Sequence, residues 1–206
     1  MKIYILRHED RTQDCSFFAP LTKKGLENST KLIDYLKKQN ITKVYCSPFI
    51  RTLQTVYPFV KETNSKNPNF KINLEYGLVE LHHEDLIPKK AVGISLPEYL
   101  AESFCCDLEY KSVIKSTDIV YPEKDKDVCL RTKRLLKKII EEHVETETNA
   151  NILLVTHQVV CAEILKIVNR GSTELDCKIE PTIITNYEKG KLSLVYDNGW
   201  TYKPIN

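Results

Sequence analysis

The sequence predicts an α/β protein in which helices cover both faces of a mostly parallel central sheet, a three-layer α/β/α sandwich. Two observations support this: apolar runs of strand length alternate with amphipathic stretches of helix length, and the connections between most of them are short. A chain of 206 residues has the size of one domain. We therefore expect a single domain over residues 1–206, with residues 81–122 as a small inserted cap.

Three apolar runs in the first part of the chain are expected to be strands, at residues 2–7, 43–47 and 71–74. A helix should follow each of the first two. Thr22 is a suitable N-cap for the first helix. Helical spacing predicts that the buried face of this helix contains Leu26, Ser29, Ile33 and Leu36.

The second helix should start at Ser47-Pro48, because a capping hydroxyl followed by proline favours a helix start. Pro58 should end or kink this helix, since proline has no backbone N–H to donate. Residues 81–122 show no clear periodicity and contain three prolines, which is why we interpret them as the cap.

Four more elements complete the predicted fold: a long amphipathic helix, a buried strand, another helix and a hairpin around Glu188-Lys189-Gly190, at 125–147, 151–157, 159–168 and 182–196. In parallel α/β sheets, ligands bind beyond the carboxyl ends of the strands. The residues that follow the strands are therefore the first candidates for a functional site.

The bulk composition excludes several classes of protein. A net charge of +2 is too balanced for general nucleic-acid binding. No apolar run approaches the roughly 18 residues that a membrane span needs, and no leader precedes the first strand. The seven cysteines contain no C-x-x-C pair and are expected to be free thiols. Together these features predict a cytoplasmic protein.

Two arginines and two histidines follow the predicted strands. Arg7-His8 ends the first strand, Arg51 lies in the first turn of the second helix, and Thr156-His157 ends the strand at 151–157. Guanidinium groups match phosphoryl oxygens, and a helix N-terminus adds backbone N–H groups. A neutral imidazole can attack phosphorus, and neighbouring cations keep it unprotonated. The sequence therefore predicts a phosphate site.

The sequence resembles the histidine phosphatase superfamily, the phosphoglycerate-mutase-like proteins. The resemblance rests on L-R-H at 6–8, L-T-K-K-G at 21–25, S-P-F-I-R-T-L-Q-T at 47–55, L-V-E at 78–80 and V-T-H at 155–157. The pattern S-P-x-x-R-x-x-Q-T is the most specific of these blocks, and it is complete here.

This resemblance implies that His8 is the nucleophile that becomes phosphohistidine, and that Glu80 gives a proton to the leaving oxygen. Arg7, Arg51 and His157 would bind the phosphoryl group. It implies no cofactor and no metal. From the residues alone, Glu80 is an acid between apolar neighbours that could raise its pKa; an ordinary loop carboxylate is the alternative.

Three positions depart from the family's usual pattern. Glu9 replaces the glycine that follows the nucleophile, and its charge would either weaken phosphate binding or point away from the pocket. Asp14 replaces a common asparagine, and Gln158 replaces a glycine. Arg11 gives an R-H-x-x-R pattern, similar to the branch related to the tyrosine phosphatases of lymphocyte signalling regulators. There the extra arginine joins the phosphate pocket; the alternative is a solvated surface arginine.

Two charged segments have simpler interpretations. His82-His83-Glu84-Asp85 could suggest a metal site, but adjacent residues rarely reach one ion, so a polar cap loop is expected. The basic run at 131–138 is expected to lie on the solvated face of its helix.

These observations predict a metal-independent phosphomonoester hydrolase that acts on a phosphorylated small molecule or a phosphotyrosine-type substrate. Two alternatives stay open. One is a phosphoglycerate-type mutase, although residues 81–122 do not resemble mutase cap motifs. The other is a phosphate-binding or interaction module with weakened catalysis, which Glu9, Asp14 and Gln158 would explain.

Overall fold

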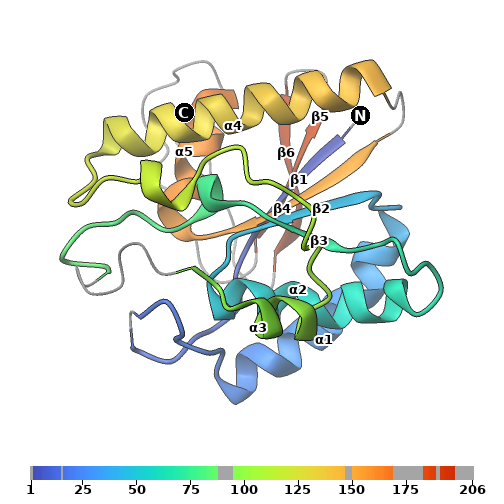
Figure 1. Cartoon of the computed structure of the whole chain (residues 1–206). Coiled ribbons are helices and arrows are strands. Elements are labelled where there is room, and N and C mark those ends of the chain that lie inside the picture. Colours follow the sequence, from blue (N-terminus) through green and yellow to red (C-terminus); the bar gives the residue numbers. More distant parts are fainter. Residues whose placement is uncertain are drawn as a thin grey trace.

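The structure, a computed structural model, describes residues 2–14, 16–87, 95–146, 150–168, 183–188 and 191–197. Its centre is a sheet with the strand order β3-β2-β4-β1-β5-β6 (Figure 1). Four strands are parallel: β1 (Lys2–Arg7), β2 (Lys43–Cys46), β3 (Ile72–Leu74) and β4 (Asn151–Thr156). β5 (Ile183–Glu188) is antiparallel to β1 and to β6 (Lys191–Asp197). The predicted mostly parallel sheet and the hairpin strands are confirmed; Lys189 and Gly190 lie outside the described residues.

Helices cover both faces of the sheet, so the predicted three-layer sandwich is confirmed (Figure 1). One face carries α1 (Lys23–Lys38) and α2 (Ile50–Asn64), with the short α3 (Glu98–Ser103) beside α2. The other face carries α4 (Asp125–Thr146) and α5 (Gln158–Val168). Two 3-10 helices, η1 (Tyr76–Leu78) and η3 (Ser116–Asp118), lie in connections. In the described ranges, no helix combines the length and apolar character required to cross a membrane.

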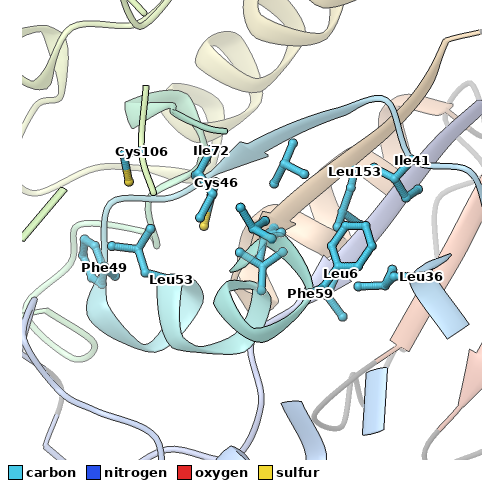
Figure 2. Close-up of a cluster of buried hydrophobic side chains, with 14 of the residues drawn as sticks. Leu6, Leu36, Ile41, Cys46, Phe49, Leu53, Phe59, Ile72, Cys106 and Leu153 are labelled. Atoms are coloured by element: carbon cyan, nitrogen blue, oxygen red, sulfur yellow. The ribbon is translucent and has the colours of Figure 1, made fainter. Parts of the chain in front are cut away.

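Alternate residues of the central strands enter two separate hydrophobic cores. On β1, Tyr4 and Leu6 belong to the core under α1 and α2, whereas Ile3 and Ile5 belong to the core under α4 and α5. Figure 2 shows the first core, which also contains Phe59 of α2. Because both faces of the sheet are covered, its central strands are apolar at nearly every position. This explains the continuous apolar runs in the sequence.

Helix α1 begins as predicted, and Ser29 and Leu36 on its predicted face are buried. The hydroxyl of the N-cap Thr22 accepts a hydrogen bond of 3.1 Å from the Gly25 N–H. Leu26 is 45% exposed, so its predicted burial is wrong, and Asn28 and Leu32 are buried instead. Gly25 lies against the backbone of Asp10, in the chain that follows β1.

Helix α2 continues through Pro58 to Asn64, so this proline does not end the helix, and the alternative of a kink stays a prediction. Val56, Phe59 and Val60 on both sides of it are buried. Their packing offsets the one helical hydrogen bond that proline removes.

The junction between β3 and η1 is organised by the fully buried Glu75. Its carboxylate accepts hydrogen bonds of 2.7–3.2 Å from Gly77, Tyr110, Ser112, Val113 and Ile114. These bonds attach segment 110–114 to the start of η1. The chain then leads from η1 directly into Glu80.

Of the predicted cap, residues 81–87 and 95–122 are described. Segment 104–107 lies along the edge of the sheet, where Ile72 donates to the carbonyl of Cys105 (3.0 Å) and accepts from the Asp107 N–H (2.8 Å). This segment therefore covers part of the exposed edge of β3. The assignment of 81–122 as a cap stays a prediction.

In the described ranges, Cys46, Cys105, Cys106 and Cys129 are free thiols. Cys15 and Cys177 lie outside these ranges.

Candidate active site

The carboxyl ends of β1, β2 and β4 meet at one edge of the sheet. Arg7 is in register with Thr156, and the backbone N–H of His8 donates to the Thr156 carbonyl at 3.0 Å. On the other side of β4, the N–H of Ser47 donates to the Val155 carbonyl at 3.0 Å. The residues that follow these three strands are thus brought together, as the sequence suggested.

His8 is buried and has a defined tautomer. Its Nδ1 lies 2.7 Å from the carbonyl oxygen of Glu9. Because a carbonyl can only accept, Nδ1 carries the proton and the lone pair is on Nε2. Burial lowers the pKa of His8 well below its usual value, and the charge of Arg51 lowers it further. The imidazole is therefore neutral at neutral pH, which is the form that can act as a nucleophile.

His157 lies beside His8, with 5.2 Å between the ring centroids. Its Nε2 shares a hydrogen bond of 2.8 Å with the Ser47 hydroxyl, and the Phe49 ring packs against it at 4.9 Å. Burial lowers the pKa of His157 well below its usual value, and the charge of Arg51 contributes. His157 is thus a second neutral imidazole, held in one orientation.

The predicted capping role of Ser47 is wrong. Helix α2 starts at Ile50, its N-cap is Phe49, and that cap makes no side-chain hydrogen bond. Ser47 instead orients His157, a residue that is distant in sequence. Such a role needs β2 and β4 to be neighbours, which local sequence does not reveal.

Arg51 is the central cation of the site. It is 2% exposed, its Cζ lies 4.5 Å from the Phe49 ring centroid, and its Nη1 donates to the Ser16 carbonyl at 3.1 Å. Its positive charge lowers the pKa of both His8 and His157. A guanidinium in this position can bind an oxyanion placed between the two imidazoles.

Arg7 and Arg11 add positive charge around His8. Both contribute to the lowered pKa of His8, Arg11 the least of the charges that act on it. Arg11 is partly buried, and its Nη1 donates to the carbonyls of Thr12 (2.7 Å) and Asp14 (3.1 Å). Arg11 therefore also supports the loop that follows His8.

Glu80 is a buried acid close to the same cations. Burial raises the pKa of its carboxyl above the usual value, whereas the Leu81 N–H at 3.0 Å and the charges of Arg51 and Arg7 lower it. The effect of burial is the largest, so the carboxyl of Glu80 stays protonated to a higher pH than that of an ordinary glutamate. This is the property that a general acid requires.

The structure gives physical reasons for two of the sequence blocks. In the S-P-x-x-R-x-x-Q-T block, Gln54 accepts from the Leu21 N–H at 2.7 Å, and the Thr55 hydroxyl accepts from the Glu9 N–H at 3.0 Å. In L-T-K-K-G, a Cβ on Gly25 would lie 2.1 Å from the Asp10 carbonyl oxygen. These residues fix the chain that carries His8.

The three departures from the family pattern do not direct side chains at His8. The carboxylate of Glu9 is buried and accepts from Asn28 of α1 at 3.2 Å. Asp14 caps its own loop by accepting from the Ser16 N–H and hydroxyl, and these bonds lower the pKa of Asp14. Gln158 is exposed at the start of α5.

In each of the two charged segments, one ionisable residue is buried while most of the others are exposed as expected. His82 is buried, and its N–H donates to the Glu123 carboxylate at 2.8 Å, whereas Glu84 and Asp85 are exposed. His83 and Asp85 form a pair near the surface, at 3.2 Å. The predicted solvated face of 131–138 is wrong for Arg131, which is 7% exposed and contacts Glu123. The other basic residues of this run are exposed as predicted: Lys133, Arg134, Lys137 and Lys138. In the part of the chain that the structure describes, no three His, Cys, Asp or Glu side chains form a metal-binding group.

Sequence comparison identifies the family of this chain. The model described as the histidine phosphatase superfamily (branch 1) matches residues 6–188. The chain belongs to this superfamily. A human relative in the same comparison, ubiquitin-associated and SH3 domain-containing protein B, is 30% identical over 147 residues. This match covers 68% of the chain and 21% of the relative, so the chain spans about a fifth of that protein.

Solved structures agree with the histidine phosphatase fold. The ecdysone phosphate phosphatase of Bombix mori, in complex with tungstate, has a TM-score of 0.70 and 14% identity, with 95% of this chain and 92% of that chain covered. A phosphoglycerate mutase from Bacillus anthracis has a TM-score of 0.62 and 19% identity, with 95% and 91% covered. At these identities, the similarity concerns the fold.

Proposed function

We propose that this histidine phosphatase superfamily member is a metal-independent phosphomonoester hydrolase that works through a phosphohistidine on His8. The observation that carries the proposal is the state of His8: a neutral imidazole with Nδ1 bonded to the Glu9 carbonyl and a lone pair on Nε2, beside a buried guanidinium. A buried cation and a buried neutral nucleophile are what phosphoryl transfer needs.

In the first step, Nε2 of His8 attacks phosphorus while Arg7, Arg51, Arg11 and His157 bind the phosphoryl oxygens. Protonated Glu80 gives its proton to the leaving oxygen, so the P–O bond breaks and an alcohol or phenol departs. The guanidinium groups stabilise the charge that builds on the oxygens. Arginine residues supply this charge, so the mechanism requires no metal ion.

In the second step, the Glu80 carboxylate takes a proton from water. This water attacks phosphorus and breaks the N–P bond, which releases inorganic phosphate and restores neutral His8. The opposite pKa shifts of the two residues suit these roles, because the nucleophile must be unprotonated while the acid is protonated.

A phosphatase differs from a phosphate-binding module in that its nucleophile, here His8, can react with the bound phosphoryl group. Glu9, Asp14 and Gln158 motivated the binding module. One oxygen of the Glu9 carboxylate accepts from Asn28, the Asp14 carboxylate accepts from Ser16, and Gln158 is exposed. This arrangement favours hydrolysis. The likeness of the R-H-x-x-R pattern to the tyrosine-phosphatase-type branch makes phosphotyrosine-type substrates the first to test, beside phosphorylated small molecules.

We expect the protein to hydrolyse p-nitrophenyl phosphate and phosphotyrosine in the presence of excess chelator. Release of inorganic phosphate is measured with and without EDTA, and phosphoglycerate isomerisation with added bisphosphate tests for mutase activity. Activity that disappears with chelator and returns with a divalent cation would overturn metal independence. Isomerisation faster than hydrolysis would assign a mutase instead.

A further inference from the structure

A buried ion pair lies next to residues 77–82, the segment that carries Glu80, and it has no part in the mechanism above. We call this segment the Glu80 loop. Arg131 of α4 binds Glu123 in a bidentate manner, with Nε to Oε1 at 2.8 Å and Nη2 to Oε2 at 3.1 Å. The two side chains are only 6% and 1% exposed. Helix α4 contacts η1, the 3-10 helix that leads into Glu80.

The pair holds the backbone on both sides of Glu80. Arg131 donates through Nη1 to the carbonyl of Gly77 at 2.7 Å and through Nη2 to the carbonyl of Glu80 at 3.4 Å. Glu123 accepts from the backbone N–H of His82 at 2.8 Å, and its own N–H donates to the His82 carbonyl at 2.8 Å. Arg131 and Glu123 thus contact positions 77, 80 and 82 of one short segment.

His82 closes this network from within the loop. Its Nδ1 lies 2.9 Å from the Glu80 carbonyl oxygen and 3.8 Å from the Glu123 carboxylate. The opposite edge of the loop faces the phosphate site, since the His82 ring contacts the Phe49 ring, with 6.3 Å between centroids. One side of the loop is therefore attached to α4 through this network, and the other side of the loop faces the active site.

We propose that Arg131 and Glu123 are positioning residues: by fixing the backbone at 77, 80 and 82, they place the carboxyl of Glu80 for proton transfer to the leaving oxygen. The inference rests on the proposed role of Glu80. A buried ion pair gives little net stability compared with apolar side chains of the same size. Its directional hydrogen bonds, in contrast, fix a geometry that apolar packing would leave looser.

The pair also has an electrostatic signature. The charges that act on Glu80 come from Arg51 in α2, Arg7 at the end of β1 and Arg131 in α4, and each of them lowers the pKa of its carboxyl. Loss of the Arg131 charge should raise the pKa of Glu80. Loss of the Glu123 charge should lower it, because Arg131 would then be uncompensated.

The test compares Arg131→Met and Glu123→Gln with Arg134→Met, a control at an exposed arginine of the same helix. We expect Arg131→Met to lower kcat/KM about 10- to 100-fold for phenyl phosphate, whose leaving group needs a proton, and much less for p-nitrophenyl phosphate. In the pH profile of kcat/KM for phenyl phosphate, the alkaline limb should move to higher pH in Arg131→Met and to lower pH in Glu123→Gln. Arg134→Met should change neither.

Amide hydrogen exchange of segment 77–83 gives a readout that does not need activity. It should become faster in Arg131→Met and stay unchanged in Arg134→Met. Three results would each overturn the inference. They are an equal loss of kcat/KM on both substrates in Arg131→Met, alkaline limbs of Arg131→Met and Glu123→Gln that move in the same direction, and unchanged amide exchange of segment 77–83 in Arg131→Met. A native protein that hydrolyses neither substrate would refute the proposed function instead, and exchange would still decide whether the pair holds the loop. If Arg131→Met does not fold, Glu123→Gln keeps the side-chain size and one acceptor.

Discussion

Replacement of His8 by alanine should lower kcat/KM for p-nitrophenyl phosphate by about four orders of magnitude or more, because it removes the atom that forms the covalent intermediate. Binding of inorganic phosphate should change far less, since Arg7 and Arg51 remain. Steady-state kinetics and competition calorimetry measure the two quantities.

His83→Ala is the matched control for this variant, because His83 lies near the surface and pairs only with Asp85 in the interactions described above. We expect it to keep native activity. If His8→Ala retained hydrolysis within about tenfold of the native rate, His8 would not be the nucleophile.

Replacement of Glu80 by glutamine should produce a loss that depends on the leaving group. For phenyl phosphate we expect kcat/KM to fall by about 10²- to 10⁴-fold, the usual contribution of a general acid. For p-nitrophenyl phosphate the loss should be much smaller, because p-nitrophenolate leaves without a proton. A loss of the same size on both substrates would show that Glu80 has another role.

The pH profile of the native protein tests the same pair of residues. Attack needs neutral His8, whose lowered pKa puts the acid limb of kcat/KM below the usual histidine range. Proton donation needs protonated Glu80, whose raised pKa puts the alkaline limb above the usual glutamate range. Activity on phenyl phosphate should therefore fall as pH rises through the pKa of Glu80, and Glu80→Gln should remove this limb. The ionisation of the substrate affects both proteins equally, so their difference isolates Glu80.

Much of the site could be predicted from the sequence because its parts are local. Arg7-His8 and Thr156-His157 follow apolar strands directly, and parallel neighbours bring strand ends to one edge of a sheet. The three-layer sandwich could also be predicted, because the alternation of strands and helices is visible in the local sequence pattern.

The roles that the sequence did not reveal depend on contacts between distant segments. Ser47 looks like a helix cap until β2 and β4 are known to be neighbours. Arg131 seemed to belong to a solvated basic run, yet it lies three residues after Val128 and four before Leu135, both buried. This helical spacing was the available signal for its burial. Glu75 has no comparable signal, because its hydrogen-bond donors come largely from segment 110–114.

The most direct test of the central claim is to trap the phosphoenzyme. The native protein is mixed with p-nitrophenyl phosphate, quenched within milliseconds in alkali, where phosphohistidine survives, and analysed by mass spectrometry and ³¹P NMR. The account predicts phosphate on Nε2 of His8, because Nδ1 is bonded to the Glu9 carbonyl. Phosphate on another residue, or turnover without any phosphoprotein, would contradict it.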